Sequence, residues 1–331
     1  MLNNKTILIT GGSGSLGNAL SEYIIKNYKP KKLIIFSRDE LKQSEMKKKF
    51  SEDKFLFMRY FIGDVRDKSR LIEALREIDV VFHAAALKQV PAGEYNPTEM
   101  IKTNVNGAQN LIEACIENNV KKVIALSTDK AANPINLYGA SKLASDKLFV
   151  AANNITGKLK TRFSIVRYGN VTNSRGSVVP IFKEHLNKKY FPITDKRMTR
   201  FWITLEQGVK FIIKSLKRMS GGEIFVPKIP SVYVTDIAKA MKPSMSHKFI
   251  GIRPGEKLHE TMCPIDDNHL TLEFKDHFVI RPTIIMQKSI NYYTNNLGEV
   301  GKKVSQNFEY NSSKNKHFLT IEEIKKYLKK I

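Results

Sequence analysis

The chain has 331 residues, of which 42% are hydrophobic, and it carries a formal net charge of +23. This length suits one large α/β unit or two coupled lobes, and the wide separation of Cys115 and Cys263 excludes a disulfide framework and a cysteine-based metal site. The apolar runs are shorter than the roughly 20 residues that span a bilayer, and the first residues read as a strand, not a signal peptide. We therefore expect a cytoplasmic protein with no membrane span and no metal.

The positive charge has two interpretations. Nucleic-acid binding would produce such a charge, but the basic residues are spread along the chain and do not gather in one arm with interleaved aromatic residues. We therefore favour lysines that are solvated on helix faces, and we expect no nucleic-acid partner. Bound nucleotides would account for only a few of the charges.

The first half of the chain alternates apolar strands with helical patterns, which predicts a parallel, doubly wound sheet covered on both faces. The expected strands span residues 6–10, 32–37, 55–64, 79–86, 122–127 and 162–170, and the expected helices span 67–77, 98–119 and 136–154. A helix at 205–219 and a strand at 223–229 return to the sheet. The predicted class is α/β, a Rossmann-like domain with a smaller, interleaved C-terminal substrate lobe. The domain would comprise 1–170 and 204–229, and the lobe 171–203 and 230–331.

The turn after the first strand is rich in glycine. The stretch "TGGSGSLG" (10–17) places Gly11, Gly14 and Gly17 at regular spacing between a strand and a helix. Glycines allow a tight turn and let the backbone approach a pyrophosphate, which the first N–H groups of the helix would bind. This position predicts dinucleotide binding, and a merely structural turn is the alternative. The same turn adds three residues to the expected cofactor site: Ser13, Ser15 and Leu16.

The end of the second strand should contact the adenosine ribose, where an Asp or Glu favours NAD. Here the strand ends in Ser37 and Arg38, a hydroxyl and a guanidinium that suit a 2′-phosphate. We therefore predict NADP; the alternative is a solvated Arg38 with Asp39 on the ribose. The other residues expected around the cofactor are Lys42, Asp64, Val65, Ala84, Ala85, Ala86, Lys88 and Asn104.

The stretch "STDKAANPINLYGASK" (127–142) follows the fifth strand and contains Tyr138 and Lys142, which share a face of a helix because they are four residues apart. The Lys142 ammonium would favour the Tyr138 phenolate and lower its pKa towards working pH, and Lys142 could also bind the nicotinamide ribose. Such a pair serves hydride transfer at a carbinol. By contrast, we interpret His83, on the fourth strand, as structural.

These features, with "FSRDELKQSEM", "AALKQVP", "SRGSVVP", "MTRFWIT" and "GGEIFVPKIPS", resemble the extended short-chain dehydrogenase/reductase family over nearly the whole chain. Within that family, retaining nucleotide-sugar dehydratases carry Asp-Glu before the tyrosine, whereas this chain carries Asp129-Lys130. In this respect it is similar to the inverting UDP-N-acetylglucosamine 4,6-dehydratases, lyases that open the pathway to pseudaminic acid and related surface sugars.

The resemblance implies a reaction with an internal redox cycle. Tyr138 would take the proton of the sugar 4-hydroxyl while a tightly bound NADP accepts the C4 hydride, and Thr128 would hydrogen-bond that hydroxyl. Lys130 would be the base at C5, and protonated Asp129 would be the acid at the departing 6-hydroxyl. Hydride return to C6 would regenerate the cofactor, and protonation of C5 from the other face would invert it, with Tyr138 or Lys130 as the donor.

Lys130 can act as a base only if some of its amine is neutral, and we expect nearby Lys142 and a desolvated cleft to favour that form. The structural alternatives are a solvated Lys130 and an Asp129 that caps a turn.

The resemblance also implies a clamp for UDP-N-acetylglucosamine. Asn170 and Arg253 match phosphate-contacting positions, and Glu256 matches one that meets the uridine ribose. A guanidinium suits a diphosphate because its planar fork makes two parallel bonds. Lys88 and Glu94 are expected in the sugar pocket. Further substrate-binding candidates are Arg175, Val179 and Arg200, of which the two arginines could equally be ordinary surface residues.

Three other functions compete with this interpretation. A UDP-sugar 4-epimerase shares the Tyr–Lys pair but needs no acid–base pair to expel the 6-hydroxyl, and a retaining 4,6-dehydratase leaves C5 unchanged. A nucleotide sensor or nucleic-acid-binding protein on an inactive scaffold would explain the charge, but the intact Thr128, Tyr138 and Lys142 argue against it. By family analogy alone we expect a homo-oligomer, either a dimer or a hexamer.

Overall fold

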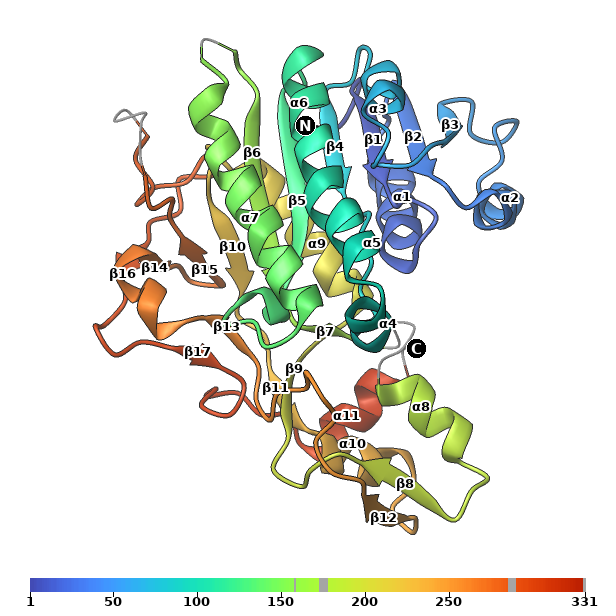
Figure 1. Cartoon of the computed structure of the whole chain (residues 1–331), viewed down its shortest axis with the longest axis vertical. Coiled ribbons are helices and arrows are strands. Elements are labelled where there is room, and N and C mark those ends of the chain that lie inside the picture. Colours follow the sequence, from blue (N-terminus) through green and yellow to red (C-terminus); the bar gives the residue numbers. More distant parts are fainter. Residues whose placement is uncertain (158, 173–177, 285–289, 330–331) are drawn as a thin grey trace.

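The computed structural model describes residues 1–157, 159–172, 178–284 and 290–329. Figure 1 shows a large α/β layer structure above a smaller lobe. Arg175 lies outside the described residues, so its expected role stays a prediction. Within the described ranges, no helix combines the length and apolarity needed to cross a lipid bilayer.

The upper part is built on a ten-stranded sheet. Its parallel part has the order β3-β2-β1-β4-β5-β6-β10, in which the direction of winding changes between β1 and β4. Strands β1, β2 and β5 are buried almost throughout, because apolar residues cover both of their faces. The bounds are β1 (Thr6–Thr10), β2 (Lys32–Ser37), β3 (Met58–Ile62), β4 (Val80–His83), β5 (Lys122–Thr128), β6 (Arg162–Tyr168) and β10 (Ile224–Pro227). The predicted doubly wound sheet is therefore confirmed.

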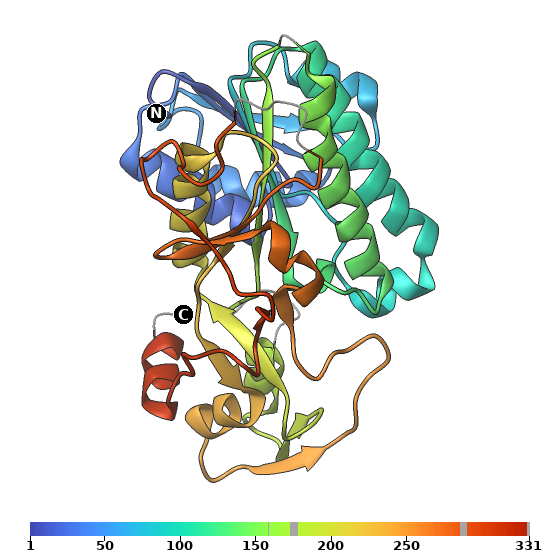
Figure 2. The ribbon, with the colours of Figure 1, turned by 90° about the vertical axis from the view of Figure 1, so that its left-hand side faces the viewer.

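Helices cover both faces of this sheet, as Figure 2 shows. On one face α1 packs against α9, and on the other α6 lies between α3 and α7. Side-chain caps begin several of these helices, such as the Asn136 side chain, which accepts the Gly139 N–H at the start of α7. The bounds are α1 (Ser15–Asn27), α2 (Glu40–Lys49), α3 (Lys68–Ala74), α6 (Gly107–Glu117), α7 (Leu137–Ile155) and α9 (Leu205–Arg218).

The helix expected at 98–119 is divided. Helix α4 (Val90–Tyr95) and helix α5 (Pro97–Ile101) precede a π-helical turn (Lys102–Asn106), and α6 follows it. A π turn inserts one residue into the helical repeat, which is a common device near functional sites. Here it directs the Asn104 side chain inward, where it is 1% exposed.

Strands from the C-terminal segment extend the same sheet. β15 (His277–Ile280) pairs antiparallel with β10, β14 (Thr271–Glu273) pairs with β15, and β16 (Lys302–Lys303) pairs with β14. We had expected residues 230–331 to form the smaller lobe, but the buried apolar side chains of β14 and β15 join the core of the sheet. The exact division into domains stays a prediction.

The smaller lobe has its own apolar core, with Phe182, Phe191 and Trp202 near its centre. A sheet of order β11-β9-β7 and a pair β12-β8 lie against its helices, in the lower part of Figure 1. The bounds are β7 (Asn170–Val171), α8 (Val178–His185), β8 (Tyr190–Ile193), β9 (Thr199–Ile203), β11 (Ser231–Tyr233), α10 (Val234–Met241), β12 (Ser246–Phe249) and α11 (Ile321–Leu328).

Between the two parts, β13 (Thr261–Cys263) pairs with β17 (Tyr310–Asn311), and short 3-10 turns lie at Asp129–Ala131 and Ile265–Leu270. The turn Asp129–Ala131 is in contact with both β13 and α7. The C-terminal segment is therefore placed beside the stretch that carries the expected catalytic residues.

The start of α7 packs directly on this turn at Gly139. A Cβ atom added at Gly139 would overlap the carbonyl oxygen of Lys130. Only glycine lets the helix bring Tyr138 this close to the backbone of the turn.

We predict that Gly139→Ala lowers the free energy of unfolding by about 1–3 kcal/mol, because the added methyl group must push the helix and the turn apart. Gly208→Ala, on α9, is the matched control, since apart from its chain neighbours and the backbone of its own helix no described atom would lie within 4 Å of its Cβ. Alanine is the better helix former, so the control should gain up to about 1 kcal/mol. Equal effects of the two changes in urea unfolding would contradict the close packing at Gly139.

Candidate functional site

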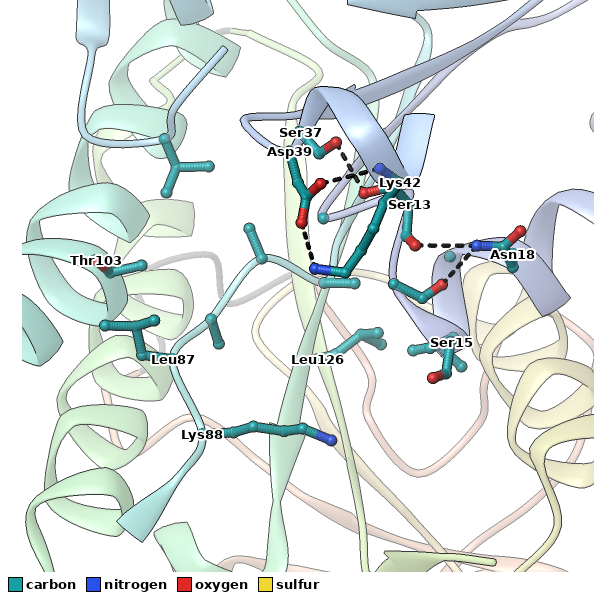
Figure 3. Close-up of a pocket in the computed structure, with 18 of the residues that line it drawn as sticks. Ser13, Ser15, Asn18, Ser37, Asp39, Lys42, Leu87, Lys88, Thr103 and Leu126 are labelled. Atoms are coloured by element: carbon teal, nitrogen blue, oxygen red, sulfur yellow. Dashed lines mark hydrogen bonds and ion pairs between the residues drawn. The ribbon is translucent and has the colours of Figure 1, made fainter. Parts of the chain in front are cut away.

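The candidate site is a cleft of about 830 Å³ at the carboxyl ends of the parallel strands. It opens where the strand order reverses, between β1 and β4, which is the usual ligand position in open α/β sheets. Figure 3 shows the part of the cleft near the glycine-rich turn. Of the expected residues, the cleft is lined by Gly11, Ser13, Gly14, Ser15, Leu16, Gly17, Ser37, Arg38, Lys42, Asp64, Val65, Ala84, Ala85, Ala86, Lys88, Thr128, Lys130, Tyr138, Lys142 and Asn170.

The glycine-rich turn forms a close-fitting cradle. Gly11 has φ +63°, and a Cβ there would lie 2.8 Å from the backbone nitrogen of Ala85. A Cβ on Gly17 would overlap the backbone of Gly12, so the start of α1 packs tightly onto the turn. Gly14 is the N-cap of α1 and lines the cleft. A bare backbone at the positive end of a helix fits an extended, anionic dinucleotide, so the residues present fit the predicted cofactor.

The far end of the cleft, where an adenosine ribose would lie, is polar. The Ser13 hydroxyl donates to the Ser37 hydroxyl at 2.9 Å, and Asp39 accepts from both the backbone and the side chain of Lys42. These bonds are drawn as dashed lines in Figure 3. The Arg38 guanidinium is half-exposed and lies 3.4 Å from Asp64. The cations Arg38 and Lys42 and the acid Asp39, the alternative contact for the ribose, therefore all lie at this end of the cleft.

Asp64, one of the residues expected around the cofactor, is held by cations. Burial raises the pKa of its carboxyl, but hydrogen bonds and charges from Arg66 and Arg38 outweigh burial, so the pKa is lowered. In addition, Arg66 connects Asp64 to Glu99 through its guanidinium.

Tyr138 and Lys142 both reach the cleft from the first two turns of α7. The expected lowering of the Tyr138 pKa is wrong for the ligand-free chain. Burial raises the pKa of the phenol to about 12, although the Lys130 cation and a hydrogen bond from Thr128 act in the opposite direction. Burial also lowers the pKa of Lys142, against the charge of Asp146. Removal of the phenolate from water therefore outweighs the favourable charges nearby.

Lys130 is the most strongly engaged ionisable group in the cleft. Its Nζ lies 3.1 Å from Asp129 Oδ1, 3.2 Å from Glu260 Oε1 and 3.4 Å from Asn170 Oδ1. Burial lowers the pKa of the amine, but the two carboxylates outweigh burial, so the pKa is raised. The expectation that proximity to Lys142 makes the amine partly neutral is therefore wrong for the ligand-free chain. Lys130 is an ammonium ion shared by two acids.

Asp129 and Thr128 complete this group. Thr128 caps the 3-10 turn, accepts the Lys130 N–H and donates its hydroxyl to Asp129 Oδ1 at 3.0 Å. Asp129 is fully buried, and its Oδ2 has no hydrogen-bond partner among the described residues. Gly169 lets the end of β6 pass close by, since a Cβ there would lie 3.2 Å from Oδ2. Asp129 therefore touches the cleft through Lys130 and does not line it.

The expected UDP clamp is only partly assembled. Asn170 lines the cleft, whereas Arg253 is exposed and pairs with Glu256 at 3.3 Å. Arg200 is buried, not a surface residue, and lies 3.5 Å from Glu256 and 3.9 Å from Glu260. It also donates to the carbonyl oxygens of Lys257 and Leu258. Arg200 therefore connects the loop 253–258, through Glu256, to Glu260 at the buried end of the cleft.

Three expected residues lie elsewhere in the described structure. Asn104 bonds both the N–H and the carbonyl of Leu87, because the π turn aims it at that loop and not at the cleft. Glu94 accepts the Leu137 N–H and so caps α7. Val179 is 1% exposed in the core of the smaller lobe. His83 is structural, as predicted, with its Nδ1 bonded to Thr10 Oγ1 in the core of the sheet.

The sequence interpretation missed Glu260. It ends the segment "RPGEKLHE", directly before the buried strand β13, and is 2% exposed. An acidic residue at the edge of an apolar strand is a usable signal, because a buried carboxylate needs a partner. That partner, Lys130, is 130 positions earlier in the chain.

One other acidic group has the spacing of a metal site, formed by Asp276, His277 and Glu299. However, Arg218 and Lys214 already neutralise both acids, at 2.6–3.1 Å. We therefore interpret this group as a structural ion-pair network.

A family model described as "Polysaccharide biosynthesis protein" matches residues 7–282 of this chain. A UDP-N-acetylglucosamine 4,6-dehydratase (inverting) of Campylobacter jejuni subsp. jejuni serotype O:23/36 (strain 81-176) is 59% identical, over 98% of this chain and 97% of that protein. A UDP-glucose 4-epimerase of Rickettsia akari (strain Hartford) is 40% identical, over 99% of this chain and 96% of that protein. The X-ray structure of Pen from Bacillus thuringiensis is similar with a TM-score of 0.88 at 34% identity, over 100% of this chain and 99% of that chain.

We predict that Lys130→Met lowers the free energy of unfolding by about 2 kcal/mol at neutral pH, because it removes the cation nearest to two buried carboxylates, Asp129 and Glu260. The change leaves Arg200, 3.9 Å from Glu260, as a more distant cation. The value is below the roughly 3–5 kcal/mol of a fully buried pair, since the Lys130 side chain is 25% exposed. The folded-state pKa of Lys130 lies above its unfolded value of about 10.4, so this stabilisation is fully present below that pH. It is lost as the pH rises through the folded-state pKa.

Urea unfolding at several pH values between about 6 and 9, where the stabilisation should be constant, checks the predicted loss in the variant. Lys49→Met is the control, because Lys49 pairs with Glu22 on the surface and such pairs contribute less than about 1 kcal/mol. The prediction fails if the two variants lose the same small amount of stability.

Proposed function

Because the chain belongs to the polysaccharide biosynthesis protein family, we propose that it dehydrates UDP-N-acetylglucosamine across C4 to C6 and inverts C5. The product would be UDP-2-acetamido-2,6-dideoxy-β-L-arabino-hex-4-ulose, formed as the first step of pseudaminic acid or related surface-glycan synthesis. The observation that carries the proposal is the Asp129–Lys130 ion pair, whose lysine lines the same cleft as Tyr138 and the glycine cradle. The relative from Campylobacter, whose printed name states this activity, supports the same assignment.

The proposed cofactor is a nicotinamide dinucleotide in the glycine-lined part of the cleft, and NADP is the finer assignment. Arg38 and Lys42 would hold the 2′-phosphate, and Ser13 and Ser37 would lie beside the ribose. When bound, this group would accept a hydride from the sugar C4 and later return it to C6. Lys142, buried next to Tyr138 on α7, would hold the ribose near the reacting carbon.

Tyr138 would exchange a proton with the sugar 4-hydroxyl. It does so as a phenolate, the form that the Lys130 charge and the Thr128 hydrogen bond favour. Because burial opposes this form, the reaction should become faster as the pH rises from neutral. Thr128 therefore acts on the tyrosine as well as on the sugar.

The ion pair supplies the acid and the base for loss of water. Moving one proton from Lys130 Nζ to Asp129 Oδ1, across 3.1 Å, converts the ion pair into a neutral amine and a carboxylic acid. The amine can then take the proton from C5. Because Asp129 does not line the cleft in the ligand-free chain, its carboxyl group would have to reach the departing 6-hydroxyl once the substrate is bound, and the pair then neither gains nor loses a proton overall. Tyr138, which has taken the proton of the 4-hydroxyl, would then donate it to C5 from the other face, which inverts C5 and restores the phenolate, while Lys130 is again an ammonium and Asp129 a carboxylate.

The substrate would lie between Asn170 and the loop 253–258. Asn170 lines the cleft beside Lys130, and Arg253 is exposed and able to turn towards a diphosphate. Glu256, now between Arg253 and Arg200, would contact the uridine ribose. A homo-oligomer and the absence of a nucleic-acid partner stay predictions.

A UDP-sugar 4-epimerase is the second candidate, and the relative named as such supports it. An epimerase uses Tyr138 and the cofactor but removes neither the C5 proton nor the 6-hydroxyl. The buried Asp129–Lys130 pair would then have no chemical task, and for that reason we favour the dehydratase.

An NMR time course in D2O tests this function, with purified protein, UDP-N-acetylglucosamine and no added cofactor. We expect a 4-keto-6-deoxy sugar of L-arabino configuration with deuterium at C5, formed with cofactor that co-purifies. A D-xylo product would retain the dehydratase but reject inversion, and UDP-N-acetylgalactosamine would identify an epimerase. If no product forms even with NADP and NAD supplied, the proposed function is wrong.

The hydrogen bond from Thr128 predicts the pH dependence of the reaction. The single Thr128 hydroxyl proton, donated to Asp129 Oδ1 in the ligand-free chain, can turn to the Tyr138 phenolate when that forms. Thr128→Val removes this donor, so the rise of kcat/KM with pH should move to higher pH by about one unit. Thr128→Ser keeps the donor and should restore the wild-type profile. An unchanged profile in the valine variant would show that Thr128 does not act on the tyrosine.

A further inference from the structure

We propose that Glu260 is a third ionisable member of the reaction site, which holds the Lys130 nitrogen together with Asp129 and Asn170. It is a positioning residue, because it acts through Lys130 and not on the sugar. The role rests on the proposed function insofar as Lys130 exchanges protons with the sugar C5. The contact itself, 3.2 Å from Glu260 Oε1 to Lys130 Nζ, is independent of any substrate.

Glu260 is held in place from its backbone. The Glu260 N–H donates to the Ser312 hydroxyl at 2.9 Å, and the Ser312 N–H donates to the Glu260 carbonyl at 2.8 Å. The Ser312 hydroxyl is also 2.7 Å from the Thr199 hydroxyl on β9. The C-terminal segment therefore fixes the position of the Glu260 carboxylate next to Lys130, which lies on the turn after β5.

Three acceptors surround the three protons of the Lys130 ammonium: Asp129 Oδ1, Glu260 Oε1 and Asn170 Oδ1. An ammonium group has three donors, so this arrangement satisfies all of them. When one proton moves to Asp129, the remaining two N–H groups still have Glu260 and Asn170 as acceptors. Glu260 thus keeps the nitrogen in place in both protonation states.

The charged residues around Glu260 determine how strongly its carboxylate favours the protonated form of Lys130. Arg200 lies 3.9 Å from Glu260. Lys257 interacts electrostatically with both Glu260 and Asp129. Tyr138, on α7, interacts electrostatically with Lys130 and Asp129. Glu260 Oε2 is buried without a hydrogen-bond partner in the described ranges, so Lys130 and Arg200, both on the Oε1 side, are its nearest stabilising cations. Loss of this carboxylate should therefore make the Lys130 amine easier to deprotonate.

The test measures the protonation of Lys130 directly in the full-length, cofactor-loaded protein. Competitive labelling with acetic anhydride over a pH series, read by mass spectrometry of the peptide that contains Lys130, follows the neutral amine. Glu260→Gln keeps the shape but removes the charge, and we expect labelling of Lys130 to be at least tenfold faster at pH 8–9. Glu260→Asp, with a retracted carboxylate, should give a smaller change of the same sign, which also covers the case in which the glutamine variant does not fold.

Glu309→Gln is the matched control. Glu309 also lies beside the β13–β17 pair, but its carboxylate bonds Lys314 and Thr261. Labelling of Lys130 should be unchanged in this variant. The proposal is overturned if folded Glu260→Gln protein labels Lys130 at the wild-type rate, or if Glu309→Gln changes the rate as much.

Because labelling needs no turnover, its result is separate from the result for the proposed function. If wild-type protein forms the keto sugar, a second readout applies. We expect Glu260→Gln to lower kcat at least tenfold with KM changed less than threefold, since the nitrogen loses a support but the UDP clamp is intact. A raised KM with unchanged kcat would make Glu260 a substrate-binding residue and would overturn its assignment as a positioning residue.

Discussion

The site depends on one partly buried cation, Lys130, that is shared by two buried acids from distant parts of the chain. Lys130 lies on the turn after β5, Asp129 precedes it, and Glu260 is on the segment that enters β13. Burying three charges is costly unless each meets an opposite charge at close range, so the C-terminal segment must pack against the turn for either part to be stable. The same constraint that joins the upper sheet to the C-terminal segment therefore also brings Asp129, Lys130 and Glu260, the proposed acid, base and positioning residue, together in one place.

The rest of the cleft follows from backbone geometry. Glycines bring the first turn, α1 and the loop after β4 into close contact, and Gly139 brings α7 onto the Lys130 turn. Tyr138 and Lys142 are therefore fixed between the cofactor cradle and the ion pair. The reaction proposed here needs proton transfers at C4 and at C5, and the two groups that make them, Tyr138 and Lys130, interact electrostatically across the cleft. One large cleft can thus serve oxidation, loss of water and reduction without release of an intermediate.

Local signals in the sequence were sufficient for the sheet, the cradle and the Tyr138–Lys142 face, because these depend on spacing along one strand–turn–helix unit. They failed where the outcome is set by distant charges or burial. The Tyr138 pKa was expected to fall and instead rises, because the sequence does not show how deeply the phenol is buried. Asn104 was assigned to the cofactor, but an unforeseen π turn redirects it to the Leu87 loop. Glu260 was missed, since its partner is far away in the chain.

A crystal structure of Tyr138→Phe protein with UDP-N-acetylglucosamine would test the central claim most directly, because the variant should bind the substrate without turning it over. The account predicts the sugar C5 at about 3.5 Å from Lys130 Nζ, with that nitrogen still bonded to Asp129 and Glu260 and the diphosphate near Asn170. A sugar whose C5 faces another side chain, with Lys130 out of reach, would contradict the account.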